Sequence, residues 1–434
     1  MSPPRMSFIR WRIFTFLFAF GLLAFVQQKS LTVAAERMMP ELGISQLQIG
    51  WLESAFVLGY TVFQIPGCIF GQRFGARRTF VISGLLAVLA MLATTAAPAI
   101  FSGQGLFVVL AGAQLLLGVA QAAIFPMSAG VFEAWFPSHQ WALVQGLQTM
   151  GVQLGAAITP PLIASLMYSY GWQRALYCAI VPAIGLIAWW GWYARDLPME
   201  HASVSAQELR HIGVRHSSVT GSPIRLAQLL LVIRNRDVLL LSLSYLCMNY
   251  VFYLLSNWVF LYLVQERHIS VLQSGWQAGT PPLAAAVGAG AGGLLTTFMC
   301  QRVGIRWGFR LVPLVSLPLA ALLLLFAVVT ANPYSAVLAL AACYASIELN
   351  EAAYWGGAMT VGRSYTMAVS GVLNTGGNLG GIISIPIVAY LSEHYLWSAG
   401  FFIGMGFAIV SAAIWLCIDT ERVLSARTSS QLIS

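Results

Sequence analysis

The sequence predicts an all-α polytopic membrane protein of about twelve transmembrane helices in two six-helix bundles, and three observations carry this prediction. Of its 434 residues, 59% are hydrophobic and only 8% are charged, against roughly 25% charged in soluble proteins. Apolar runs of about 20 residues, the length that crosses a bilayer, recur along the whole chain. One long polar stretch divides these runs into two equal groups.

The apolar runs place the expected spans. In the first half they lie near 13–33, 47–69, 79–97, 104–130, 141–168 and 175–193. In the second half they lie near 238–263, 271–298, 309–330, 334–360, 366–392 and 397–418. The predicted organisation is an N-terminal six-helix bundle at 1–193, a cytoplasmic linker at 194–237 with one short surface helix, and a C-terminal six-helix bundle at 238–434. The linker is rich in Ser, Gly and charged residues, as flexible connections are.

Basic residues predict the orientation. Of the 22 lysines and arginines, eighteen fall on one side of the membrane, Arg37, Arg174 and Arg267 fall on the other, and Lys29 lies within a span. Short loops rich in Lys and Arg stay cytoplasmic, so both termini are expected to face the cytoplasm. The first run follows three arginines, as a signal peptide would, but it leads directly to a second span and is expected to be retained.

Composition and motifs exclude several protein classes. The net charge of +8 does not indicate nucleic-acid binding, because the arginines are spread between hydrophobic runs and not gathered on one exposed face. The six cysteines lie in or beside apolar runs without metal-ligand spacing. The chain contains no catalytic triad pattern, phosphate-binding loop or HExxH motif. We therefore expect a monomeric transporter of a small solute in the lipid bilayer, with no enzymatic activity, catalytic residue, metal or cofactor.

The two halves share a loop motif. The loop after the second span reads GCIFGQRFGARR (Gly67 to Arg78), and the loop after the eighth reads GGLLTTFMCQRVGIRWGFR (Gly292 to Arg310). A glycine-bearing helix end followed by Arg-x-Gly-x-Arg, repeated six spans apart, indicates an internal repeat. Channels and membrane enzymes show such a repeat less often than transporters do.

Five separated segments carry a family resemblance. They are GWLESAFVLGYTVFQIPGCIFGQRFGARR at 50–78, LLGVAQAAIFP at 116–126, YARDLPMEHASVSAQEL at 193–209, NYVFYLLSNWVFLYLV at 249–264 and SGVLNTGGNLGG at 370–381. Together they resemble the major facilitator superfamily, in the version of its anion:cation symporter family. The resemblance covers nearly the whole chain. It implies two six-helix bundles around a central solute site, alternating access, and a sugar acid, another carboxylate or phosphate as substrate, often with protons. It also implies a bacterial inner membrane.

The chain departs from that family at three acidic positions. Gln72 precedes Arg73 where the loop motif usually has Asp, Gln27 and Gln28 stand where the first span commonly has Asp-Arg, and Gln121 aligns with a fourth-span Glu. Amides do not titrate, so proton coupling by the family's usual route is not expected. Uniport or exchange, coupling through Glu351, and a sodium-linked route remain as alternatives.

Lys29 is the only lysine of the chain. An ionisable residue inside a span costs about 2.5–3.5 kcal/mol on insertion scales, which suggests a use. We expect its ammonium to attract an anionic solute. In the alternative interpretation it extends toward the outer surface, where Glu36 and Arg37 lie and where Glu53 is also expected.

The tenth span contains two acids. Glu348 and Glu351 are three residues apart and Trp355 follows four residues later, so helical spacing puts all three on one face. Glu348 and Glu351 are the candidate coupling residues, and structural pairing is the alternative.

Polar side chains at helical spacing supply the other solute-binding candidates. In lipid such side chains should face the bundle interior, because hydrocarbon cannot satisfy them; hydrogen bonding between helices alone is the alternative. The candidates are Tyr60, Gln64, Gln121, Gln153, Tyr250, Tyr253, Asn257, Asn374 and Asn378.

The loop motif supplies the gating candidates. Arg73, Gly75 and Arg77 are expected at the cytoplasmic gate, with topological anchoring as the alternative. The predicted function is a secondary transporter of a small organic anion by alternating access. The alternatives are a facilitator of a neutral or zwitterionic solute and a pore-type channel.

Overall fold

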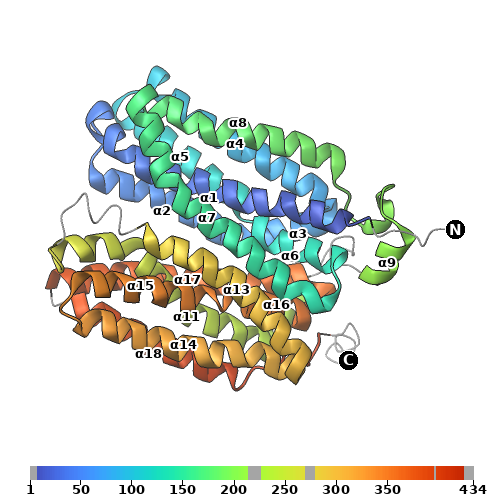
Figure 1. Ribbon diagram of the computed structural model, residues 1–434. Helices are drawn as coiled ribbons and strands as arrows, with labels where there is room; N and C mark the ends of the chain where they lie inside the picture. The colour runs from blue at the N-terminus through green and yellow to red at the C-terminus, as the bar shows by residue number, and fades with distance from the viewer. Residues whose placement is uncertain (1–6, 214–225, 269–278, 395–396, 425–434) are drawn as a thin grey trace. The chain divides into compact units, whose positions relative to one another are not determined.

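Helices supply all the regular secondary structure in the part of the chain that the computed structural model describes, residues 7–213, 226–268, 279–394 and 397–424. The helices of the first half run alongside one another (Figure 1), with α4 and α8 in contact and α1 packed on α8. Their bounds are α1 Ile9–Leu42, α2 Gln46–Val62, α3 Gln64–Phe74, α4 Ala76–Ile100, α5 Gly103–Gln121, α6 Ile124–Trp135, η1 Ser138–Gln140, α7 Trp141–Tyr170 and α8 Trp172–Tyr193.

The described parts of the linker and of the second half are also built from helices. The bounds of the linker elements are η2 Pro198–Glu200, α9 Ala206–Ile212 and α10 Leu226–Arg234. Those of the second half are α11 Arg236–Gln265, α13 Thr280–Val303, α14 Ile305–Val329, α15 Pro333–Glu348, α16 Glu351–Gly362, η3 Arg363–Tyr365, α17 Thr366–His394 and α18 Trp397–Trp415. The first residues of the predicted eighth span, 271–278, lie outside the described residues.

The described helices confirm the predicted spans. Ten stretches are long and apolar enough to cross a membrane, or eleven if α2 and α3 form one bent span. One of these stretches, Pro333–Ser392, has 60 residues, far more than the roughly 20 that one crossing needs. It contains α15, α16 and α17 and therefore holds two crossings, which brings the number to the predicted twelve.

Three of the predicted continuous spans are broken. The second span bends by 49° between α2 and α3, the fourth is interrupted at Ala122 and Ala123, and the tenth at Leu349 and Asn350. At the tenth-span break the Asn350 amide donates to the carbonyl oxygens of Ser346 and Ile347, at 2.7 and 3.2 Å. A side chain that bonds these carbonyls competes with the regular helical hydrogen bonds. Breaks of this kind expose backbone groups inside a bundle, where polar ligands can reach them.

The chain divides into two compact units whose border runs through α7. The first unit comprises Met1–Phe136 and Gly155–Ile224, and the second comprises Pro137–Leu154 and Arg225–Ser434. The first half of α7 packs on α13, because a Cβ at Gly146 would come within 2.7 Å of the Gly293 Cα. In the second half of α7, a Cβ at Gly155 would lie 2.6 Å from the Leu22 carbonyl oxygen of α1.

Candidate functional site

Lys29 lies near the middle of α1. The helix has 34 residues, and Lys29 is about 5 Å past its midpoint at about 1.5 Å per residue. Its side chain is partly buried, and the opposite charge that acts on it is that of Glu53 on α2. Glu53 also accepts a hydrogen bond from Thr32 Oγ1 at 2.8 Å. The close ion pairs among the described residues involve only arginines, so Lys29 and Glu53 interact across a longer gap.

Two buried amides are joined where the family resemblance implies acids. The Gln121 amide, at the end of α5, donates to Gln27 Oε1 at 3.0 Å and to the Ala24 carbonyl oxygen at 3.2 Å. Gln27 and Gln121 are 5% and 3% exposed. A neutral hydrogen bond between the first and fourth spans therefore replaces a pair of groups that could titrate.

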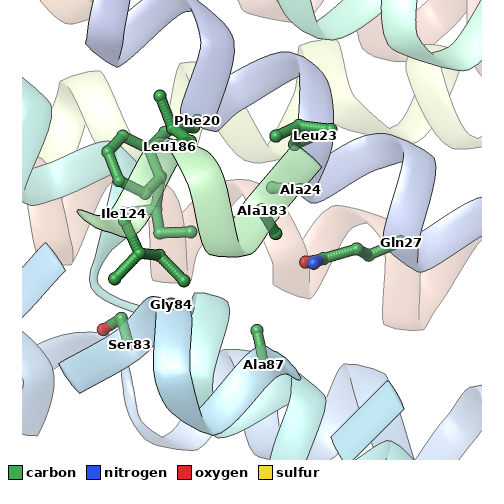
Figure 2. Close-up of a pocket in the computed structure, with 11 residues that line it drawn as sticks. Phe20, Leu23, Ala24, Gln27, Ser83, Gly84, Ala87, Ile124, Ala183 and Leu186 are labelled. Atoms are coloured by element: carbon green, nitrogen blue, oxygen red, sulfur yellow. The ribbon is translucent and has the colours of Figure 1, made fainter. Parts of the chain in front are cut away.

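A small pocket lies beside Gln27, lined by residues of α1, α4, α6 and α8. Figure 2 shows Gln27 extending toward this space from α1, with Ser83 on the wall formed by α4. The other lining residues are apolar. The pocket therefore offers no charged group to a solute.

The break in the second span separates two predicted binding residues. Tyr60 ends up on α2, with its ring stacked on Phe56 at 5.8 Å between centroids. Gln64 begins α3 and is fully buried, and neither of its amide atoms has a hydrogen-bond partner within the described residues. A buried amide without partners is costly, so both amide atoms of Gln64 could bond to a ligand that reaches them.

In the second unit, the polar residues predicted on one face of α11 contact two different helices. The Tyr253 hydroxyl donates to Asn378 Oδ1 of α17 at 2.8 Å, and the Asn378 amide donates to the Asn374 carbonyl oxygen. Tyr250 is buried elsewhere, with its ring stacked on Phe407 of α18 at 4.6 Å. The structure therefore brings Tyr253, Asn374 and Asn378 together but leaves Tyr250 apart from them.

Asn257 lies one turn beyond Tyr253. Its side chain is exposed, and its amide donates to the Tyr253 carbonyl oxygen of the same helix at 3.0 Å. Its amide oxygen therefore remains the group available to a solute.

The two acids of the tenth span flank its break. Glu348 ends α15 and Glu351 begins α16, so they do not share one continuous helix as the spacing suggested. Glu351 accepts hydrogen bonds from Trp355 Nε1 at 2.7 Å and from the Tyr245 hydroxyl at 3.1 Å. The Gln153 amide of α7 interacts with Glu348.

Two residues of this cluster were not predicted from the sequence. Tyr245 belongs to α11, about a hundred positions before Glu351, and no local pattern links them. Asn350 bonds to Ser316 of α14 at 2.8 Å, and its position between two glutamates was the one available signal.

The loop motif that contains the gating candidates is hydrogen-bonded to the end of α8 and the start of the linker. Arg77 donates through Nε to the Gly191 carbonyl oxygen at 2.8 Å, and its backbone N–H donates to Asp196 Oδ1 at 2.7 Å. Gly75 has φ +84°, and a Cβ there would lie 2.3 Å from Asp196 Oδ2, so both the conformation and the space require glycine. Burial raises the pKa of Asp196, and its hydrogen bond from Arg77 opposes that shift.

Arg73 stands apart from this contact. It is exposed, and its guanidinium lies 5.5 Å from the centroid of the adjacent Phe74 ring. The second unit contains a related contact, in which Arg310 Nε donates to the Ile418 carbonyl oxygen at 2.8 Å. Each unit therefore has an arginine near the start of its third span that bonds to a carbonyl near the end of its sixth.

Twelve spans in two units, with buried polar side chains at helix breaks, define a multi-pass membrane transport protein. The sequence profile of the Major Facilitator Superfamily matches residues 16–366. The chain belongs to this superfamily, which confirms the predicted resemblance and the prediction of a transporter and not an enzyme.

Three bacterial transporters are similar to this chain in sequence. A probable sulfoacetate transporter, SauU, of Cupriavidus necator is 26% identical over 374 residues, covering 86% of this chain and 84% of the relative. A probable galactarate/D-glucarate transporter, GudP, of Escherichia coli is 23% identical over 401 residues, covering 90% and 88%. A hexuronate transporter of Bacillus subtilis is 25% identical over 408 residues, covering 92% of each.

Solved structures share the fold. The proton:xylose symporter XylE superposes with a TM-score of 0.76 at 12% identity, covering 99% of this chain and 100% of that one. The E. coli fucose:proton symporter FucP has a TM-score of 0.70 at 13% identity, covering 97% and 100%. At these identities the comparison supports the fold alone.

Proposed function

We propose that the protein is a secondary transporter that moves a small organic anion, a sugar acid or another carboxylate or sulfonate, by alternating access of its two halves. The names of the relatives support the anion class, since sulfoacetate, glucarate, galactarate and hexuronate are all organic anions. They do not favour a neutral-solute facilitator or a pore.

The observation that carries this proposal is the position and isolation of Lys29. It is the only lysine in 434 residues, it lies near the middle of α1, and it has no close carboxylate in the described ion pairs. A cation that is only weakly compensated inside a span attracts an anion. Glu53 would hold the ammonium in place while the solute is absent.

Each unit also offers uncharged hydrogen-bond partners for a solute. A hydroxylated acid needs hydrogen-bond partners for its hydroxyl groups as well as for its carboxylate. In the first unit Gln64 has an unpartnered amide. In the second unit the Tyr253 and Asn378 pair supplies a phenol and an amide.

The proposed setting is the inner membrane of a bacterium. Both termini and the linker would face the cytoplasm, because eighteen basic residues fall on that side and three on the other. We propose that a monomer, with bundles at 1–193 and 238–434, is the working unit and that nucleic acid has no role.

The test is counterflow in proteoliposomes. Vesicles loaded with unlabelled D-glucarate, D-galactonate or sulfoacetate should take up the same labelled anion in a saturable manner. Lys29→Gln should reduce affinity by about 10- to 100-fold, the loss expected when a hydrogen bond to a charged group is removed. Arg37→Gln, an exposed cation on the same helix, is the matched control and should retain wild-type affinity.

Three results would contradict the proposal. Non-saturating flux would indicate a pore, and saturable exchange of neutral sugars in preference to the anions would indicate a different substrate class. Wild-type affinity in a folded Lys29→Gln protein would remove the role given to Lys29. A thermal-shift series with the same anions separates a folding defect from a binding defect, because a ligand stabilises the state that it binds.

A further inference from the structure

The break in the tenth span encloses two acids away from water. Glu348 and Glu351 are 1% and 6% exposed, and they lie on opposite sides of Leu349 and Asn350. The two carboxyl groups are close enough to interact electrostatically. Two negative charges at this depth in a bundle would be costly unless a cation or a proton compensates them.

No cation of the described second unit compensates this pair. The groups that act on the two acids are Tyr245 from α11, Gln153 from α7, Tyr344 from α15 and Trp355 from α16. All four are uncharged at neutral pH.

The other elements packed on the break contribute no charge to it either. These elements are α13, α14 and α17. Arg302 on α13 and Arg306 and Arg310 on α14 do not act on either glutamate, and Arg310 bonds to the Ile418 carbonyl oxygen instead. The described side chains of α17 carry no charged group. A proton is therefore the simplest compensation that these surroundings allow.

The two acids differ in their hydrogen bonds. Glu351 accepts hydrogen bonds from two donors, Tyr245 and Trp355, as a carboxylate requires. Glu348 has one oxygen, Oε2, that is buried without a partner among the described residues. A carboxylic acid needs fewer hydrogen-bond donors than a carboxylate does. The surroundings therefore favour a protonated Glu348 and an ionised Glu351.

We propose that Glu348 and Glu351 hold one transported proton between them, so that anion transport is coupled to protons through the tenth span. In the loaded state Glu348 is a neutral acid and Glu351 a carboxylate. Release breaks the Glu348 O–H bond and passes the proton to a water molecule, which becomes hydronium, and it leaves two negative charges. That state becomes accessible only when water reaches the break. Gln153 would link this step to the motion of α7.

This inference rests on the proposed function, and its test separates the two. Proteoliposomes containing the whole protein are given an inward gradient of one pH unit and labelled D-glucarate, D-galactonate or sulfoacetate. A solute carried with one proton can accumulate about tenfold under this gradient, since a factor of ten corresponds to about 1.4 kcal/mol. Wild type should show this accumulation, together with counterflow of the same anion at equal pH.

Glu348→Gln and Glu351→Gln should keep counterflow and lose the gradient-driven accumulation. Glu421→Gln, an exposed acid of the same unit, is the matched control and should accumulate the anion as wild type does. Accumulation at the wild-type level in both tenth-span variants overturns the inference. So does a wild-type protein that exchanges anions without responding to the gradient, and this result leaves the proposed function intact. Absence of counterflow in wild type rejects the proposed function and the inference together.

A second measurement covers variants that fail to fold. Unmodified protein in detergent, weakly buffered with a pH-sensitive dye, receives D-glucarate at a series of pH values between about 5 and 9. Linkage requires the bound proton number to change with anion binding if the two ligands are coupled. A proton change of up to one per protein supports the inference, and no change at any pH overturns it.

Discussion

Glu208 and Arg10 form a buried ion pair, with Oε1 and Nη1 3.6 Å apart and side chains 0% and 5% exposed. The same carboxylate accepts the backbone N–H groups of Ile9 and Arg10, at 3.1 Å each. These are N–H groups of the first turn of α1, which lack partners within their own helix. Glu208 belongs to α9, so a residue of the linker caps the first transmembrane helix.

Removal of this cap should destabilise the protein. We expect Glu208→Ala to lower Tm by roughly 5 °C or more, because it leaves Arg10 as a buried charge without its carboxylate and removes a helix cap. Gln207→Ala, an exposed position on the same short helix, should leave Tm within about 1 °C. Equal Tm values for the two variants in a thermal unfolding assay in detergent would show that the cap contributes nothing.

His201 should make stability depend on pH. Burial lowers the pKa of His201 below its usual range, and the positive charge of Arg195 lowers it further. The unfolded chain therefore binds the proton more tightly than the folded protein does, and stability is lost as pH falls below about 6.5, the ordinary histidine value. The Ser203 N–H donates to His201 Nδ1 at 3.2 Å, a hydrogen bond that needs this ring nitrogen unprotonated.

Thermal unfolding at pH 7.5 and pH 5.5 checks this prediction. The fall in Tm between the two values should be smaller for His201→Asn than for wild type, because Asn cannot gain a proton. His211→Asn, at an exposed position of α9, is the control and should retain the wild-type fall. The assignment to His201 fails if its variant keeps the full pH dependence.

Gly292 should prove essential for the break in the tenth span. A Cβ at this position of α13 would lie 2.1 Å from the Leu349 carbonyl oxygen, and one at Gly288 would lie 2.2 Å from that of Ala345. Both contacts are with backbone, so Gly292→Ala must displace α13 or the break, and we expect lower Tm and slower counterflow. In contrast, Gly112→Ala on α5 meets nothing within 4 Å and should match or exceed wild-type Tm, since Ala is favoured over Gly in helices by about 1 kcal/mol. Normal counterflow in Gly292→Ala would mean that the close approach is dispensable.

Tyr253→Phe should weaken solute binding without unfolding the protein. The variant removes the donor to Asn378 Oδ1, and we expect an affinity loss of about fivefold or more, corresponding to about 1 kcal/mol. Counterflow at varied anion concentration measures it. Tyr334→Phe, which alters a tyrosine that is 62% exposed at the start of α15, should change nothing. If both variants bind alike, the Tyr253 and Asn378 pair serves packing alone.

The periodic features of the sequence were sufficient for the spans and for local side-chain relations. Hydrophobic runs gave the twelve crossings, and the four-residue spacing of Glu351 and Trp355 is confirmed by their 2.7 Å hydrogen bond. The breaks could not be found in this way. At the tenth span the chain stays apolar on both sides, and the interruption depends on Asn350 and on the close approach of Gly292, which are contacts made only after folding.

Contacts between helices that are far apart in the sequence could not be predicted either. The joined amides Gln27 and Gln121 are 94 positions apart, and hydropathy marks neither as the partner of the other. Tyr250 and Tyr253 share a helical side in a simple projection, yet one stacks on α18 and the other bonds to α17. A projection shows which residues are neighbours on a helix, whereas the surrounding helices decide where each side chain packs.

The division of α7 between the two units has a consequence for biosynthesis. Residues Pro137–Leu154 pack with the second unit, where Gln145 lies against Met359 and Gly146 against Gly293. The ribosome makes this half of the helix long before those partners exist. During synthesis the first half therefore remains in the membrane with only half of α7 packed. An N-terminal fragment expressed alone should be degraded by membrane quality control more readily than the complete chain.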